Sequence, residues 1–198
     1  MLYEHLGARP RIDDTAVIAP TAVISGDVEI GPNCQVLHGA VITAEGGPIR
    51  LGEHVIVMEN ALIRATAANA VHIGDHTLIG TLASIAGATV GEEVFFASGA
   101  RVFNGSIVGA RCEIRVNAIV TRRAVLPEST VVPIGWVAAG DPVQLFSPDQ
   151  ADEIARAQPD LDFPGHVFGV DRDTPDLMVQ LTERYGSSLA RHADDRAL

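Results

Sequence analysis

Aliphatic residues recur along this chain at every sixth position. One series runs from Ile12 to Ile42 and another from Val90 to Val132. Neither an α-helix, which repeats every 3.6 residues, nor an alternating strand, which repeats every two, has this period. A coil of three short strands joined by tight corners does, because each strand directs one large side chain inward. We call these recurring residues anchors. Further anchors lie between the two series, at Leu51, Val57, Ile63, Ile73, Ile79 and Ile85.

The residue four places after an anchor is usually small or β-branched, as at Ala22, Cys34, Ala83 and Cys112. Such side chains suit the crowded corners of a triangular coil. Equivalent positions of successive coils stack about 4.8 Å apart. Cys34 and Cys112 then share one column about 19 Å apart, well beyond the roughly 7 Å at which two Cα atoms can be bridged. We therefore expect two buried free thiols.

Several anchors are followed directly by glycine, as in Ile30-Gly31, Ile73-Gly74, Ile79-Gly80 and Val90-Gly91. Over residues 11–143 this pattern resembles the hexapeptide repeat of left-handed parallel β-helices. The repeat itself predicts an all-β solenoid of about seven triangular coils. The left-handed sense is what the resemblance implies.

Two interruptions and a C-terminal extension complete the predicted domain organisation. Residues 43–50 and 64–72 are expected to be short loops at a corner. Residues 147–192 form a helical extension, whose first helix opens at the capping sequence SPDQ and ends near residue 157. We expect residues 193–198 to fray. A second helix, starting at Thr174-Pro175, carries an apolar stripe that we expect to pack along a flat face of the β-helix: Leu177, Leu181, Tyr185 and Leu189.

Charge and composition restrict the partners. The formal net charge of −11 opposes binding to nucleic acid or to an anionic membrane surface. All 14 basic residues are arginine, which excludes a Schiff-base lysine and a phosphate-binding lysine loop. No apolar run is long enough to span a bilayer, and the N-terminus lacks the apolar core of a signal peptide. We expect a cytoplasmic protein.

Three features resemble the γ-class carbonic anhydrases: the opening RIDDTAVIAPTAVISGDVEIG, the loop pattern after Ile42, and the five-residue step from Ile85 to Val90. The resemblance implies a homotrimer with zinc between subunits, held by two histidines of one chain and one histidine of its neighbour. Zinc in such an open site lowers the pKa of its bound water to about 7, which yields hydroxide to attack carbon dioxide.

Other residues stand at the positions where this family carries its zinc ligands. By the resemblance these positions are Arg64, Thr81 and Ala86. A guanidinium remains charged and offers no lone pair, and a hydroxyl and a methyl cannot replace two imidazoles. The supporting Arg-Gly-Asp and Gln-Asp of the family appear as Thr43-Ala44-Glu45 and Met58-Glu59. We expect no zinc, no other cofactor, no catalytic residue at this position and no appreciable hydration of carbon dioxide.

Other interactions can replace the metal at this position. If the trimer persists, Arg64 of one subunit faces Glu59 and Thr81 of the next, so we hypothesise a cross-subunit ion pair from Arg64 to Glu59 or to Glu45. The crevice would then bind a small anion on Arg64 or be inert within a scaffold or larger assembly. The alternative is that Arg64 is a solvated side chain. We expect His38, which shares a column with Glu59 and Thr81, to hydrogen-bond a carboxylate.

A second column offers an alternative metal site. His54 and His76 stand three places after the anchors of successive coils, with Glu93 next and Arg111 after it. Two imidazoles and a carboxylate about 5 Å apart are possible zinc ligands. The favoured interpretation is that this column lies at an outward corner of the solenoid and that Arg111 forms an ion pair with Glu93.

The second candidate function, from a different class, is that of an acyltransferase. Residues 118–144 resemble the final coil of hexapeptide-repeat acyltransferases, which bind coenzyme A between subunits. The ending Gly140 to Gln144 lacks their basic residue, although Arg122 and Arg123 could meet phosphates, and no histidine stands in the usual loop context for deprotonating an acceptor. The γ-class anhydrases have the same final coil, so the segment does not discriminate. Coenzyme A is expected as a ligand under this alternative only. A further alternative function is that of a γ-class carbonic anhydrase with a non-standard site.

Overall fold

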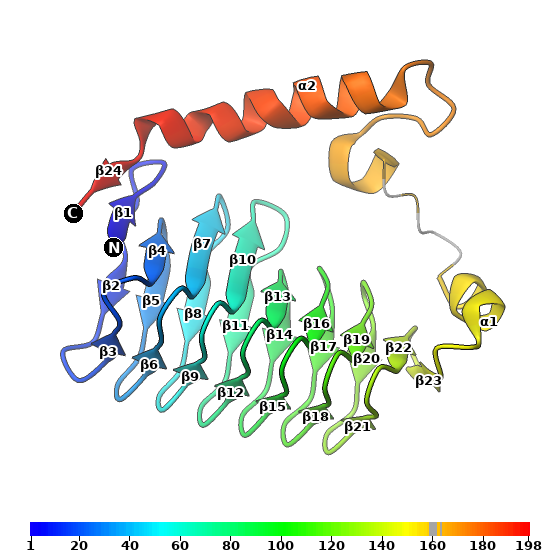
Figure 1. Ribbon diagram of the computed structural model, residues 1–198, viewed down its shortest axis with the longest axis horizontal. Coiled ribbons are helices and arrows are strands. Elements are labelled where there is room, and N and C mark those ends of the chain that lie inside the picture. The colour runs from blue at the N-terminus through cyan, green and yellow to red at the C-terminus, as the bar shows by residue number, and fades with distance from the viewer. Residues whose placement is uncertain (159–161, 163) are drawn as a thin grey trace.

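The computed structural model describes residues 1–158, 162 and 164–198, and its main body is a parallel β-solenoid of about eight turns (Figure 1). The fold is the left-handed β-helix that the resemblance implies, with about one turn more than the seven coils expected. In the described part of the chain, the strands form three sheets of ten, seven and seven strands. Neighbouring strands are parallel, except where β24 joins β1 and β23 joins β22.

The strands of each sheet come from successive coils. The first sheet contains, in spatial order, β23 (Gln144–Phe146), β22 (Val137–Ala139), β19 (Ile119–Val120), β16 (Arg101–Val102), β13 (Ser84–Ala86), β10 (Leu62–Thr66), β7 (Val41–Glu45), β4 (Val23–Ser25), β1 (Leu2–Glu4) and β24 (Arg196–Ala197). The second contains β2 (Arg11–Ile12), β5 (Val28–Ile30), β8 (Ile49–Leu51), β11 (Val71–Ile73), β14 (Thr89–Val90), β17 (Ile107–Val108) and β20 (Val125–Leu126). The third contains β21 (Val131–Val132), β18 (Glu113–Ile114), β15 (Phe95–Phe96), β12 (Leu78–Ile79), β9 (Ile56–Val57), β6 (Gln35–Val36) and β3 (Val17–Ile18).

The six-residue anchors form the core. Ile42, Ile63 and Ile85 lie directly opposite one another on β7, β10 and β13, and all three are fully buried. Each such side chain contributes about 1.5–3 kcal/mol by leaving water. Cys34 and Cys112 are buried and free, as predicted. Burial raises the pKa of both thiols, because a thiolate would lose its hydration.

The two interruptions are largely strand rather than loop. Strands β7 and β10 extend beyond the strands of the other coils and rise toward the C-terminal helix (Figure 1). Five residues of one strand pair with five of the other, from Val41 opposite Leu62 to Glu45 opposite Thr66. The expected loops are therefore confined to short turns, because the added residues continue the hydrogen-bonded ladder before the chain reverses.

The solenoid begins earlier than residue 11, because β1 pairs in parallel with β4. At its other end, the Gln150 side chain accepts a hydrogen bond from the Ser147 backbone N–H at 2.9 Å, but Ser147 is not the helix N-cap that the sequence predicts. Helix α1 (Ala151–Arg156) begins three residues later than expected, with Gln150 as its N-cap and no side-chain capping hydrogen bond.

The remaining elements lead the chain back along the solenoid. The π-helical turn η1 (Pro164–Phe168) precedes helix α2 (Leu177–Leu189), and the 3₁₀ turn η2 (Ala190–Asp194) follows it. Helix α2 crosses above the ends of β7 and β10 (Figure 1). Its predicted apolar stripe is its buried side: Leu181 is buried, and Leu177, Tyr185 and Leu189 are half-buried.

Residues 193–198 were expected to fray. Instead, β24 adds to the edge of the first sheet, with Tyr3 opposite Ala197 and Glu4 opposite Arg196. An edge strand presents unpaired backbone N–H and C=O groups, and the returning chain end satisfies them. Both chain ends therefore meet at the first coil. Among the described helices, none combines the length and apolar content needed to cross a membrane.

Candidate functional site

The chain brings together two of the three positions that the resemblance assigns to zinc ligands. Arg64 of β10 and Ala86 of β13 are paired residues on neighbouring strands of the first sheet. Thr81 lies five residues before Ala86, at the corner between β12 and β13. The chain turns at that corner, where Leu82 has a φ of 62°. The side-chain hydrogen bonds of Arg64 go to other residues.

Arg64 is held by two other side chains. Its Nη2 donates to Glu45 Oε2 at 2.5 Å and to the Tyr185 hydroxyl at 2.7 Å, and its guanidinium carbon lies 6.0 Å from the centre of the Tyr185 ring. The Arg64 side chain is 30% exposed and that of Glu45 is 15% exposed. The extended end of β7 supplies Glu45, and α2 supplies Tyr185. We call these three residues the Arg64 cluster.

The Arg64 cluster corrects the predicted partners. Arg64 pairs with Glu45 of its own chain, because the β7 extension carries Glu45 alongside β10, and the pair between subunits stays a prediction. The alternative of a solvated Arg64 is wrong, since two side chains bind the guanidinium. Tyr185 was predicted only as part of an apolar stripe. Its role could not be read from the sequence, because it lies 121 positions from Arg64.

Burial disfavours the charged form of Arg64, but hydrogen bonds to Tyr185 and Glu45 and the attraction of the Glu45 carboxylate outweigh it. The pKa of the guanidinium is therefore raised above its usual value, and Arg64 is a permanent cation. Its Nε is buried without a hydrogen-bond partner among the described residues.

The other expected residues of this region lie on the neighbouring corner. Thr81 Oγ1 donates to Glu59 Oε2 at a long 3.4 Å. His38 Nδ1 lies 2.7 Å from Thr21 Oγ1. In the structure, the hydroxyl of Thr21 therefore takes the place of the expected carboxylate partner of His38.

The second predicted column forms with its expected spacing. The rings of His54 and His76 stack with centroids 5.0 Å apart. His54, His76, Glu93 and Arg111 all have φ between 53° and 58°, so they occupy equivalent corner positions. Arg111, however, pairs with Glu128 rather than with Glu93. The carboxylate nearest His76 is that of Glu53, whose Oε1 lies 3.8 Å from Nε2.

The acyltransferase candidates lie at another corner. Arg122 and Arg123 follow β19, where Arg122 is half-buried and Arg123 is exposed. The Arg122 Nε is buried without a partner in the described part of the chain.

The fold and the repeat together define a hexapeptide-type β-solenoid protein. No family model matches the sequence. The mitochondrial γ carbonic anhydrase 1 of Arabidopsis thaliana is 30% identical over 152 residues, which is 74% of this chain and 53% of that protein. The carboxysome assembly protein CcmM of a Nostoc species is 29% identical over 178 residues, 83% of this chain and 30% of that protein. The crystal structure of a candidate acetyltransferase from Bacillus cereus has a TM-score of 0.56 and 14% identity, covering 98% of both chains, and shows a shared fold.

The chain is thus a γ-carbonic anhydrase-like protein. It spans about half the length of its Arabidopsis relative.

Proposed function

We propose that this protein is a metal-free scaffold at the position where relatives would hold zinc, and that this position instead fastens the C-terminal helix α2 to the solenoid. The single observation that carries the proposal is the Arg64 cluster, in which one guanidinium binds Glu45 of the solenoid and Tyr185 of α2. Hydration of carbon dioxide through a zinc-bound water is then lost.

The residues present do not fit a zinc ion. Zinc is held by thiolate, imidazole or carboxylate groups that donate lone pairs. Arg64 has none to donate, Ala86 has no donor atom, and Thr81 offers one weak hydroxyl that already contacts Glu59. The raised pKa of Arg64 keeps a positive charge where the divalent cation would stand. No step of a zinc mechanism can therefore be assigned to these residues.

A scaffold role is better supported than binding of a small anion at Arg64. The positive charge of Arg64 is already balanced by Glu45 at 2.5 Å. An anion would have to replace a charge-assisted hydrogen bond worth about 1.5–3 kcal/mol and leave the Glu45 carboxylate unpaired nearby. One of the remaining donors of Arg64, Nε, is buried.

Self-association is part of this proposal. The column that contains Thr81 continues with Val116 and Ile134 in later coils, and Leu82 follows Thr81; all three apolar side chains are exposed, Leu82 by 61%. These side chains lie beside the corner that the resemblance places at the subunit interface. Burying them against a second copy is favourable, and a three-fold heterologous interface closes on itself. The relative named as a carboxysome assembly protein is consistent with a scaffold role.

The test compares the natural protein with a variant in which the three zinc-ligand positions become histidine: Arg64→His, Thr81→His and Ala86→His. Hydration of carbon dioxide is followed by stopped flow with added zinc, and the oligomeric state by native mass spectrometry. We expect a trimer of the natural chain that gives no rate above the uncatalysed reaction. Any gain of rate in the triple variant would show that only the ligands are missing. A chelator-sensitive hydration rate of the natural protein would overturn the proposal.

A further inference from the structure

Three potential metal ligands converge where the two ends of the chain meet. His5 follows strand β1, while His192 and Asp195 belong to turn η2 and the residue after it. Each offers one ligand atom, and these atoms all lie within 4.8 Å of one another, the one such group of three among the residues that the structure describes. We call these three residues the terminal cluster.

The two imidazoles address the same carboxylate. His5 Nδ1 lies 2.5 Å from Asp195 Oδ1, and His192 Nδ1 lies 2.9 Å from Asp195 Oδ2. The rings stack with centroids 4.4 Å apart and an interplanar angle of 18°. Both Nδ1 atoms therefore point the same way, toward one small volume beside the carboxylate. His5 is only 2% exposed, so one nitrogen donor is buried in this volume.

Two imidazoles and one carboxylate are a donor set that zinc prefers, with bonds of about 2.0–2.2 Å and water in the fourth position. Ligand atoms around one tetrahedral ion lie roughly 3.3–3.5 Å apart on those bond lengths. The separations in the terminal cluster, from 2.5 Å for His5 and Asp195 to less than 4.8 Å overall, bracket that value. Shifts of about 1 Å in side chains at the chain ends would accommodate the ion.

The backbone holds the ligands in place. Strand β24 pairs with β1, and the Leu198 N–H donates to the Leu2 carbonyl at 3.0 Å. These bonds fix the segment that carries Asp195 against the segment that carries His5. Much of the ordering that a metal site requires is therefore complete before an ion binds.

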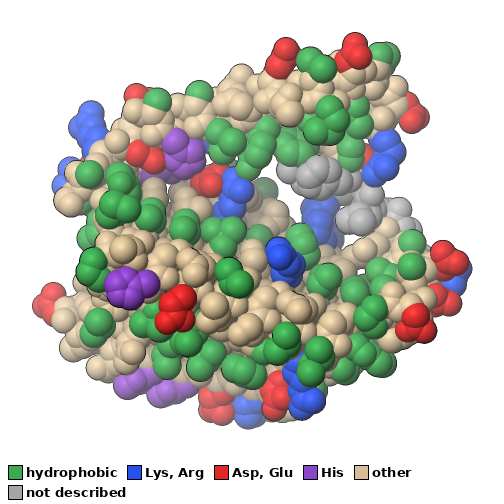
Figure 2. Space-filling model, in the orientation of Figure 1, with side chains coloured by type: hydrophobic (Ala, Val, Ile, Leu, Met, Phe, Trp, Pro, Cys, Tyr) green, Lys and Arg blue, Asp and Glu red, His purple; other side chains and the backbone are tan. Residues whose placement is uncertain are grey.

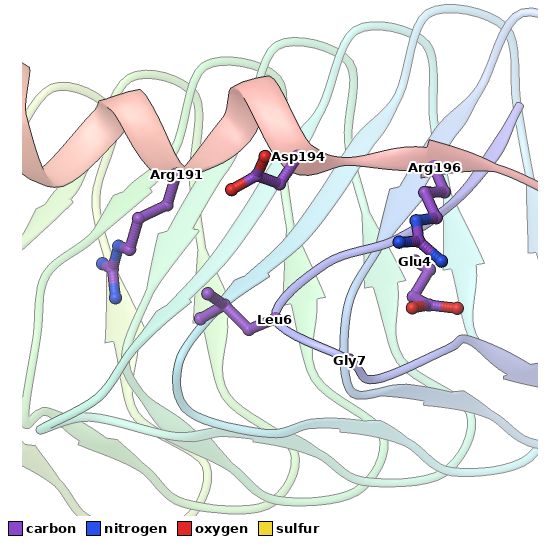
Figure 3. A pocket seen from close by; sticks show the side chains of 6 residues that line it. All are labelled: Glu4, Leu6, Gly7, Arg191, Asp194 and Arg196. Carbon is purple, nitrogen blue, oxygen red and sulfur yellow. The ribbon is translucent and has the colours of Figure 1, made fainter.

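The surroundings do not oppose a cation. A cavity of about 240 Å³ is formed by the same two chain segments that carry the three ligands (Figure 3), and it is lined by Glu4, Leu6, Gly7, Arg191, Asp194 and Arg196. Its two arginines are matched by two carboxylates, with Glu4 and Arg196 facing one another in Figure 3. The net charge of −11 over the whole chain favours approach of a divalent cation.

We propose that His5, His192 and Asp195 bind one divalent transition-metal ion, with zinc the best match, and that this ion fastens the C-terminal segment to the first coil of the solenoid. The ion would be structural, because the buried His5 ring closes one side of it. This site is separate from the Arg64 position, which lies three coils further along the first sheet.

The experiment uses the full chain, stripped of metal with a chelator and then dialysed. Zinc ions alone are titrated by calorimetry, and bound zinc is counted by mass spectrometry after gel filtration. Cobalt ions are the spectroscopic probe, since a four-coordinate site gives intense visible absorption. Asp195→Asn keeps the shape of the ligand while removing its charge, and His192→Ala removes a ligand. The matched control is the double variant His54→Ala and His76→Ala, which deletes the other stacked histidine pair.

We expect one zinc ion per chain in the natural protein and the control. We expect zinc to bind at least about 100-fold more weakly to Asp195→Asn and to His192→Ala. Loss of a metal ligand should lower the zinc affinity at least as much as loss of a residue that only orients a ligand. The visible cobalt bands should vanish in both variants. Less than one zinc ion per ten chains in the natural protein would mean that the cluster holds hydrogen bonds only, and undiminished zinc in Asp195→Asn would place the metal elsewhere. Either result overturns the inference, whereas the hydration assay tests the scaffold proposal independently.

Discussion

Replacement of Arg64 by alanine tests whether the Arg64 cluster holds helix α2. The change removes the hydrogen bond from the guanidinium to the Tyr185 hydroxyl, which is 2.7 Å long. A hydrogen bond to a charged group contributes about 1.5–3 kcal/mol. The change also leaves Glu45, only 15% exposed, without its cationic partner beneath α2. A buried polar group without a partner costs about 1–3 kcal/mol, and release of α2 would let water relieve that cost.

The two effects add, because both favour the released state of α2. We take about 3 kcal/mol for Arg64→Ala, near the lower end of their sum, since neither group is fully buried. At 1.36 kcal/mol per factor of ten, the population of released α2 should rise about 150-fold. Tyr185→Phe removes only the hydrogen bond, so its effect should be about 1.5 kcal/mol, or a little over tenfold.

Figure 2 shows the molecule hollowed between the C-terminal helix and the solenoid. Local release of α2 does not require the solenoid core to unfold. Amide hydrogen exchange of residues 177–189, followed by mass spectrometry, measures this release. Arg101→Ala is the matched control, because Arg101 lies exposed on β16 of the same sheet.

The double variant Arg64→Ala and Glu45→Ala gives the sharpest outcome. Removing Glu45 as well eliminates the carboxylate that would otherwise lack a cationic partner. The amides of α2 should therefore be better protected from exchange in the double variant than in Arg64→Ala alone. The reasoning is refuted if exchange of α2 in Arg64→Ala stays within about twofold of the natural protein. It is also refuted if the double variant is no better protected than the single one.

Three further substitutions test the solenoid. Ile63→Ala should lower the free energy of unfolding by about 2–5 kcal/mol, measured by denaturant titration, because it leaves a cavity in a fully buried column; a loss below 1 kcal/mol would contradict the packing. Gly26→Ala should destabilise by more than about 1 kcal/mol, since Gly26 has a φ of 82° and an added Cβ would lie 2.7 Å from the Ala44 carbonyl oxygen; thermal unfolding unchanged within 1 °C would speak against it. The hydrogen bond from Arg50 holds the pKa of Asp27 below its usual value, although Asp27 is 39% exposed. A lowered pKa in the folded state gives stability that is present above the unfolded-state pKa of about 3.9 and is lost as the pH falls through the folded-state value. Asp27→Asn should therefore cost about 0.5 kcal/mol at pH 7 and nothing in strong acid, and an equal cost at both pH values would argue for a different cause.

Local spacing was enough to predict most of the fold. The anchors, the free thiols and the stacked His54 and His76 all follow from one fact: a solenoid coil contacts only its neighbours, so the register of one coil determines the next. The contact of Gln150 with Ser147 was predictable for a similar reason, since three residues separate its partners. The predictions from the sequence were wrong where the chain leaves the repeat, as in the extensions of β7 and β10, where loops were expected.

The clusters at Arg64 and at the chain ends could not be predicted in the same way. The spacing of His192 and Asp195 was a weak local signal, but nothing in the sequence connects them with His5, which lies 190 positions from Asp195. The same holds for Tyr185 and Arg64. Contacts between residues so far apart close long loops and leave no repeating pattern in the sequence. The hydrophobic periodicity therefore cannot predict them.

The sequence by itself determined the β-helix and its register, because both depend on residue identity within one coil. Only the tertiary structure decided that the chain returns along the solenoid and that its end pairs with its beginning. That return depends on edge hydrogen bonds and a few side-chain contacts between residues more than a hundred positions apart, and it is what turns Arg64 from an isolated charge into a bridge between the solenoid and its last helix.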